Sequence, residues 1–221
     1  MNQGEKSELL HRLEQLYPAP QSELNFANDY QLLVSVVLSA QCTDKKVNDT
    51  TPELFAKFPD FRTLGSARLP ALEKIIRPIN YYRTKAKHLL ASAKLVEKNF
   101  GGKVPRTMEE LRSLPGVGQK TANVVLNELG AAQTLPVDTH VFRVARRLGL
   151  ASADTVAKVE EEIKAQFNAG SWRDLHHWLI LHGRRICKAR TPLCGKCVLN
   201  DLCPSAQLGA EPIALIRPKA R

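Results

Sequence analysis

Four of the chain's five cysteines lie within one short segment, and this segment constrains the fold more than any other feature. They are separated by gaps of six, two and five residues: Cys187, Cys194, Cys197 and Cys203. Such gaps are too short for separate structural elements, so one loop must wrap one inorganic centre. A four-cysteine zinc site is the simpler alternative, but zinc ligands usually come as two spaced pairs. A single compact array favours an iron-sulfur cluster.

The charge of the chain points to a polyanionic partner. The 221 residues carry a formal charge of +10 at pH 7. Such an excess of positive charge favours binding to a polyanion through counterion release. The simpler alternative is that the charge only keeps the protein soluble. From residue 175 onward the only acidic residues are Asp201 and Glu211, so the basic end of the chain is also its cysteine end. We expect a mobile basic tail after the last cysteine.

The longest apolar run, residues 32–40, is far shorter than the roughly 20 residues that span a bilayer. The N-terminus lacks a signal-peptide pattern. We therefore expect no membrane segment and a cytoplasmic location. In that reducing compartment, grouped cysteines are more often metal ligands or catalytic residues than disulfides.

Helical periodicity dominates the chain and strand patterns are nearly absent, so we expect an all-α protein. Apolar residues repeat at helical spacing in four stretches: Leu9, Leu13 and Leu16; Leu72, Ile75, Ile76 and Ile79; Val141, Val144, Ala145 and Leu148; and Val156, Val159, Ile163 and Phe167. Asp154 is the expected N-cap of the last helix.

Residues 114–126 predict two helices joined by a Pro-Gly-x-Gly turn. Gly116 and Gly118 permit the tight reversal, and a new helix begins near Gln119 or Lys120. The unpaired amides of this helix start can hold a phosphate, although such turns also join helices that bind nothing. The helix dipole disfavours an ammonium at Lys120, which favours a nucleophilic amine. Taken alone, a lysine here is more often a phosphate contact.

Residues 137–148 predict a further helix with Asp138 or Thr139 at its N-cap. Capping is the usual role of such an aspartate. On the same view Arg143, Arg146 and Arg147 form a solvated face.

Taken together and in this order, the motifs resemble endonuclease III, a bifunctional DNA glycosylase and abasic-site lyase of the helix-hairpin-helix superfamily. The resemblance covers about residues 22–203 and rests on these segments: residues 38–44, 114–122, 137–140, 176–184 and the four-cysteine loop. It implies a six-helix barrel domain over residues 22–132. Residues 1–21 and 133–221 would form a second domain that holds a 4Fe-4S cluster on the four cysteines, and the active site would lie in the groove between the domains.

The resemblance implies that Lys120 is the nucleophile. It would attack C1′ of a flipped-out oxidised pyrimidine nucleotide and leave a Schiff base, and β-elimination would then cut the strand. Asp138 would stay ionised and stabilise positive charge on the sugar. The partner would be double-stranded DNA that contains oxidised pyrimidines or abasic sites, bound by a monomer associated with the nucleoid.

The resemblance also implies a set of DNA-binding residues: Gln41, Tyr81, Gly116, Gly118, Gln119, His140, Arg143, Lys188 and Arg190. Gln41 would fill the gap left by the flipped nucleotide, whereas Cys42 is a packing residue. The chain departs from the family at Asn80-Tyr81, where a glycine followed by leucine or phenylalanine is common. We expect this departure to affect how efficiently the strands are opened and which base is preferred opposite the lesion.

Two other functions are disfavoured by the sequence. An adenine-mismatch glycosylase of the same superfamily lacks the nucleophilic lysine and carries an extra C-terminal domain. A non-catalytic DNA-binding iron-sulfur protein would not need both Lys120 and Asp138.

Overall fold

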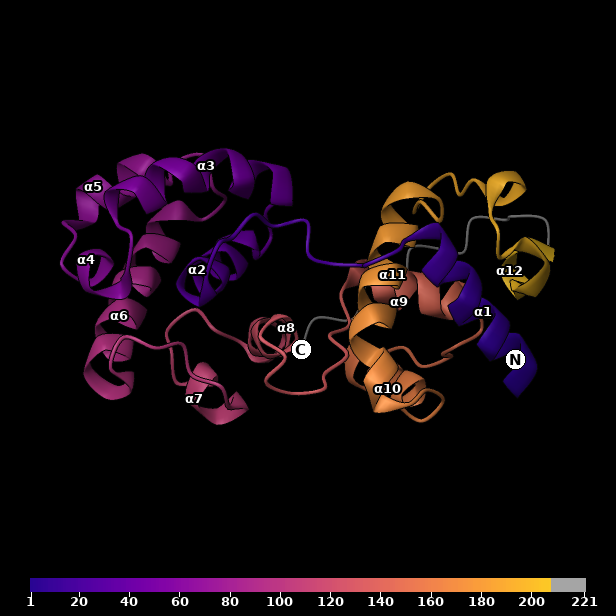
Figure 1. The fold of residues 1–221 in the computed structure, drawn as a ribbon. Helices are drawn as coiled ribbons and strands as arrows, with labels where there is room; N and C mark the ends of the chain where they lie inside the picture. Colours follow the sequence, from indigo (N-terminus) through magenta and orange to yellow (C-terminus); the bar gives the residue numbers. More distant parts are fainter. Residues whose placement is uncertain (208–221) are drawn as a thin grey trace. The chain divides into compact units, whose positions relative to one another are not determined.

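The computed structural model describes residues 1–207, and all the regular structure within them is helical (Figure 1). The basic tail predicted from the sequence lies largely beyond residue 207, outside this range. No helix in residues 1–207 is long and apolar enough to cross a membrane. The chain divides into two compact units: one is Ser22–Ala132, and the other combines Met1–Gln21 with the described residues from Gln133 onward.

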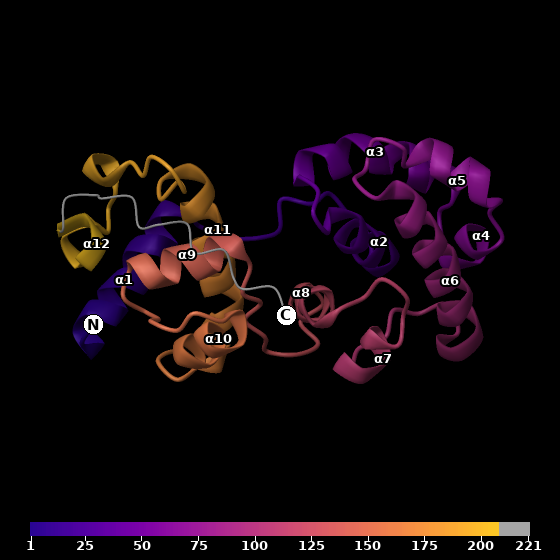
Figure 2. The ribbon, with the colours of Figure 1, turned by 180° about the vertical axis from the view of Figure 1, so that it is seen from behind.

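The first unit, which we call the barrel unit, is built around one buried helix. Its helices are α2 (Asp29–Ser39), α3 (Asp44–Lys57), α4 (Phe61–Gly65), α5 (Leu69–Ile75), α6 (Tyr82–Phe100), α7 (Met108–Arg112) and α8 (Gln119–Glu128). Every residue from Leu32 to Leu38 of α2 is buried. A helix that is apolar on all sides must be covered on all sides. Helices α3, α6 and α8 all pack against α2 and close the core (Figure 2).

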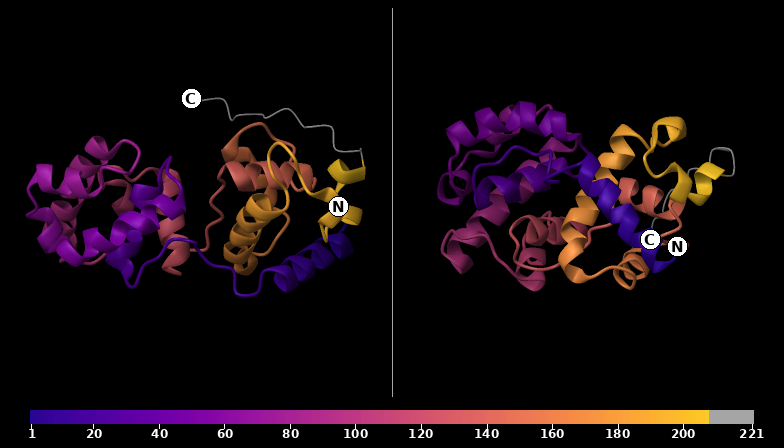
Figure 3. Two further views of the ribbon diagram at one scale, coloured as in Figure 1. Left: turned by 90° about the horizontal axis from the view of Figure 1, so that it is seen from above. Right: turned by 45° about the vertical axis from the view of Figure 1, so that its right-hand side comes forward.

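The second unit, which we call the cluster unit, has its own apolar core. Its helices are α1 (Gln3–Leu16), α9 (Thr139–Arg147), α10 (Val156–Lys164), α11 (Trp172–Arg185) and the short α12 (Pro204–Gln207). Helix α11 packs against both α9 and α1 (Figure 3). The indole Nε1 of Trp178 in α11 donates to the backbone oxygen of Tyr17 at 3.0 Å, just after α1. Helix α1 and the helices after residue 133 therefore share one core.

The predicted helical stripes are largely buried, and the exceptions lie near helix ends. Leu9 and Leu13 are fully buried, but Leu16 is 38% exposed at the last position of α1. Ile79 is buried although α5 already ends at Ile75. The predicted N-cap at Asp154 is wrong. Thr155 caps α10 instead, because the Asp154 carboxylate pairs with Arg146 at 2.7 Å.

Candidate active site and iron-sulfur centre

The predicted hairpin is present between α7 and α8, and Lys120 lies directly after it. The amide of Val117 donates to the carbonyl of Leu114 at 3.1 Å, and Gly116 has a φ of +83°. Proline followed by glycine at the centre of such a turn is the pattern of a type II turn. A Cβ on Gly116 would meet the Cβ of His88 at 3.0 Å, so glycine is needed for space as well as for conformation.

Helix α8 begins at Gln119, as predicted, with Gly118 as its N-cap and no side chain capping it. The first amides of the helix therefore have no side-chain acceptor at the cap, which suits the binding of an anion such as a phosphate. Both Gln119 and Lys120 are exposed, so the Lys120 amine is accessible to a large substrate.

The predicted DNA-contacting residues Gln41 and Tyr81 share an unusual backbone. Gln41 has a φ of +53° and Tyr81 a φ of +58°, the left-handed region that residues with a side chain rarely adopt. Each such residue costs about 1 to 3 kcal/mol of strain. Both side chains are exposed, and Tyr81 is 67% exposed. The neighbouring Cys42 packs against the core of the barrel unit, as expected.

Asp138 caps α9 with a well-defined geometry. One of its carboxylate oxygens accepts the amides of His140 and Val141, both at 2.8 Å. These bonds fix the orientation of the carboxylate and stabilise its charge. Burial lowers the pKa of half-buried His140, an effect that Asp138 opposes. Capping and catalysis are therefore compatible at Asp138. Lys120 belongs to the barrel unit and Asp138 to the cluster unit.

Two arginines of α9 bind the start of the cysteine loop rather than forming a solvated face. Arg143 donates to the carbonyls of Gly183 and Cys187 at 2.9 and 3.1 Å. Arg147 is only 5% exposed and donates to the carbonyls of Lys188 and Ala189 at 2.7 and 2.9 Å.

The expectation of a solvated face is thus wrong for Arg147. A periodic helix pattern cannot show that a loop some forty residues later covers the arginine. The guanidinium of Arg143, predicted to contact DNA, has partners within its own unit.

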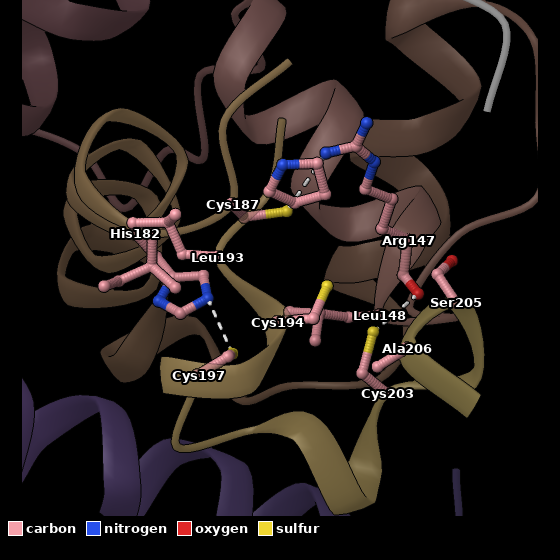
Figure 4. A pocket seen from close by; sticks show the side chains of 12 residues that line it. Arg147, Leu148, His182, Cys187, Leu193, Cys194, Cys197, Cys203, Ser205 and Ala206 are labelled. Carbon is pink, nitrogen blue, oxygen red and sulfur yellow. Dashed lines mark hydrogen bonds between the residues drawn. The ribbon is translucent and has the colours of Figure 1, made fainter. Parts of the chain in front are cut away.

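The four cysteines line one cavity of about 40 Å³ (Figure 4). None of them forms a disulfide. Nitrogen atoms of three residues face the sulfurs: Arg147 Nη1 lies 3.4 Å from the Cys187 sulfur, and His182 Nε2 and the Leu199 amide each lie 3.4 Å from that of Cys197. Hydrogen-bond donors of this kind stabilise the negative charge of sulfur ligands in a cluster.

His182 was not predicted as part of this site. It is buried, and burial lowers its pKa to about 4, so the ring is neutral at pH 7. Its Nδ1 lies 3.3 Å from the Tyr17 hydroxyl. In the tautomer that accepts from this hydroxyl, Nε2–H points at the sulfur of Cys197. The only signal in the sequence was a histidine on the helix that leads into the cysteine loop.

The chemistry of the cavity fits an iron-sulfur cluster better than a single ion. Within residues 1–207, no three His, Cys, Asp or Glu side chains converge closely enough to hold one metal ion. Zinc requires four ligands about 2.3 Å from one point. Thiolates spread around a cavity suit a cluster, in which separate irons bind separate cysteines. Burial raises the pKa of the Cys197 thiol to about 11, so this cysteine needs a bound cation to become a thiolate at pH 7.

Lys188 and Arg190 are exposed in the loop between the first two cysteines, as predicted. The carbonyls of Lys188 and Ala189 are held by Arg147. The loop thus presents two cations from a fixed backbone.

Comparisons with known proteins agree with this geometry. Residues 34–169 match the family described as HhH-GPD superfamily base excision DNA repair protein, and residues 187–203 match the iron-sulfur binding domain of endonuclease III. Endonuclease III of Synechocystis sp. is 42% identical over 91% of this chain and 92% of its own length. Endonuclease III of Escherichia coli is 40% identical over 92% of this chain and 96% of its own length.

Solved structures show the same relationship. A non-covalent endonuclease III–DNA complex is 37% identical, with a TM-score of 0.88 over 94% of this chain and 98% of that one. A thermostable thymine-DNA glycosylase, at 22% identity and a TM-score of 0.82, shares the fold.

The fold and the two matched segments define a base excision DNA repair enzyme of the helix-hairpin-helix class, a DNA glycosylase and abasic-site lyase. The chain belongs to the endonuclease III family. The predicted fold class and activity are confirmed, as is the 4Fe-4S cluster on the cysteine loop.

Proposed function

We propose that this enzyme removes oxidised pyrimidines from duplex DNA through Lys120 and then cuts the abasic site. The accessible amine of Lys120 at the start of α8 carries the proposal, because it follows directly on a turn suited to a DNA phosphate. A solved relative described as a trapped endonuclease III–DNA covalent intermediate supports a covalent route.

The reaction proceeds in two stages. The Lys120 nitrogen forms a bond to C1′ while the bond between C1′ and the base breaks, and the base leaves with the electron pair and takes up a proton. Ring opening gives a protonated Schiff base. Loss of a proton from C2′ then expels the 3′ phosphate, which cuts the strand.

Asp138 stabilises the positive charge that develops on the sugar and assists the proton transfers. Its carboxylate accepts two backbone amides, which favour the ionised form. A charged, oriented carboxylate is what this role requires.

The proposed DNA contacts form four groups. The amides around Gly116, Gly118 and Gln119 bind a phosphate, and Lys188 and Arg190 bind phosphates from the cluster loop. Gln41 occupies the space left by the flipped nucleotide, and Tyr81 stacks between bases. His140 and Arg143, which follow Asp138 on α9, form the fourth group. We propose that a monomer, with each unit as a domain, acts on nucleoid DNA.

Borohydride trapping tests the nucleophile. The unchanged protein should form a covalent adduct with a duplex that contains an abasic site, and Lys120→Gln should bind the duplex without forming the adduct. Lys87→Gln, at another exposed lysine of the same unit, is the control and should trap normally. Absence of the adduct in the unchanged protein would exclude the lyase mechanism.

The substrate is tested with lesion duplexes. Thymine glycol, dihydrouracil, uracil and a plain abasic site should be scored separately for base release and strand cutting. Base release from the first two and not from uracil would support the proposed specificity, and the reverse order would contradict it.

A further inference from the structure

One side chain links the two exposed turns that carry Gln41 and Tyr81. The amide Nδ2 of Asn80 donates to the backbone oxygen of Gln41 at 2.7 Å, across 39 residues of sequence. Gln41 follows the end of α2, and Tyr81 is the residue immediately before α6. The bond therefore joins the ends of two different helices at the surface of the barrel unit.

A second residue, Lys85, also holds this region in place. Lys85 of α6 is 7% exposed, and its Nζ donates to the carbonyls of Leu38 and Ala40 at 2.8 and 2.6 Å. Together, Asn80 and Lys85 supply donors to three of the four backbone carbonyls from Leu38 to Gln41. Hydrogen bonds from these two side chains thus hold the turn after α2 to the start of α6, in addition to the packing of Cys42 against the core.

The backbone of the Gln41 turn is the kind that normally contains glycine. The amide of Cys42 donates to the carbonyl of Ser39 at 2.9 Å, with Ala40 at φ −56° and ψ 116° and Gln41 at φ +53°. These angles are close to a type II turn, whose third position favours glycine. The chain uses glycine at the matching position of its other such turn, Gly116.

The strain at Gln41 and Tyr81 is not offset by burial of their side chains, because both are exposed. Residues with a strained backbone cluster at active sites and ligand-binding sites. In the proposed function that target is the flipped-out site in the duplex. Holding the two side chains in place before binding reduces the ordering cost of association.

We propose that Asn80 is a positioning residue that joins Gln41 and Tyr81 into one rigid wedge for paired DNA. The proposal rests on the proposed function. Tyr81 stacks between bases and Gln41 occupies the vacated space, and the tether sets their spacing. The Asn80-Tyr81 pair, the chain's departure from its family pattern, is then a way of stiffening the wedge through a side chain that glycine lacks.

The test measures kcat and KM for base release from a duplex with a paired oxidised pyrimidine. Asn80→Ala and Asn80→Leu both remove the donor, and Leu keeps approximately the shape of Asn. Loss of one hydrogen bond should raise KM roughly 3- to 10-fold, with a smaller change in kcat. For strand cutting at an abasic site in single-stranded DNA, which needs no wedge, the KM values of the variants and the unchanged protein should be the same.

A direct readout comes from 2-aminopurine placed opposite the lesion. In a Lys120→Gln background, which binds without turnover, its fluorescence should rise on binding and rise less when Asn80 is also replaced. A residue with a merely structural role would not change this signal.

Asn48→Ala is the matched control. Asn48 also bridges backbone segments of the barrel unit, donating to the carbonyl of Glu23 and accepting from the amide of Asn25, each at 2.8 Å. Its loss should lower the melting temperature without changing KM or the fluorescence rise.

Failure of the unchanged protein to trap or to release a base would overturn the proposed function. An active unchanged protein whose Asn80 variants keep the original KM on paired DNA would overturn the wedge proposal alone.

Discussion

The two units of this chain hold their functional segments in different ways. The barrel unit surrounds the buried stretch Leu32–Leu38 of α2 with apolar side chains, and the turn after this helix is held by the polar side chains of Asn80 and Lys85. The cluster unit fixes its loop with buried guanidinium groups and with sulfur ligands around a cavity. We expect the barrel unit to be stable by itself and the cluster unit to depend on its inorganic centre.

Loss of the cluster should produce the largest difference in stability between the two units. Cys197→Ser removes one ligand, and because structural metal binding is also folding free energy, the cluster unit should lose more than about 4 kcal/mol. Hydrogen exchange should show loss of protection in α9 and α11 but not in α2 and α6. Cys42→Ser, in the barrel unit, should leave all four helices protected. Equal loss of protection in both units would refute the comparison.

Arg147→Met should give the next largest effect. It leaves the carbonyls of Lys188 and Ala189 without their charged donor, at a cost of about 3 kcal/mol in the free energy of unfolding. Chemical denaturation and iron content would both report it. The control is Arg146→Met on the same helix, whose partner Asp154 is exposed, and it should cost less than about 1 kcal/mol. Similar losses in the two variants would show that the loop does not depend on Arg147.

Lys85→Met tests the barrel unit and should cost about 2 kcal/mol. The carbonyls of Leu38 and Ala40 lose a buried donor. Burial lowers the pKa of Lys85, so the charged form already carries a desolvation cost and the net loss stays moderate. Exposed Lys87→Met should change the free energy of unfolding by less than about 0.5 kcal/mol. The cluster unit should keep its iron in both variants.

The smallest effect is expected at Asp60, the N-cap of α4. The Thr63 amide donates to its carboxylate at 2.7 Å and holds its pKa below the ordinary value. A lowered pKa means that the stabilisation is complete above the pKa of the unfolded chain and is lost as the pH falls through the lower, folded value. Asp60→Ala should cost about 1 kcal/mol at pH 7 and progressively less below about pH 4.

Asp60→Asn is the control, because it keeps the acceptor oxygen but cannot titrate. At pH 7, denaturation should give this variant nearly the same free energy of unfolding as the unchanged protein. In acid, its stability should depend less on pH. A difference between the alanine variant and the unchanged protein that is the same at pH 7 and pH 3 would show that the carboxylate charge plays no part.

What the sequence predicts well in this chain is local. The hairpin turn follows from Pro115 and Gly116, and the apolar stripe of residues 72–79 is buried as its spacing predicts. The N-cap at Asp138 follows from the stripe that begins at Val141.

What it misses depends on contacts between distant segments. Asp154 and Thr155 are both good caps, and the choice is made by Arg146, one residue before the end of α9. The burial of Arg147 depends on a loop 40 residues later. The bond between Asn80 and Gln41 joins two turns whose separate patterns show no relationship.

The division of the chain has a consequence for how the protein is made. Helix α1 is secured by residues that are synthesised much later. Arg12 donates to Asp201 at 2.6 Å, Tyr17 accepts a hydrogen bond from Trp178 at its backbone oxygen, and the Tyr17 hydroxyl lies 3.3 Å from His182 Nδ1. At roughly 5 to 20 residues per second, the ribosome needs roughly 10 to 40 s to supply them. The barrel unit emerges complete in the meantime, whereas an isolated 14-residue helix is only marginally stable in water. Leu9 and Leu13 therefore stay uncovered until the cysteine loop has left the ribosome, and α1 is secured after the barrel unit although it precedes that unit in the chain.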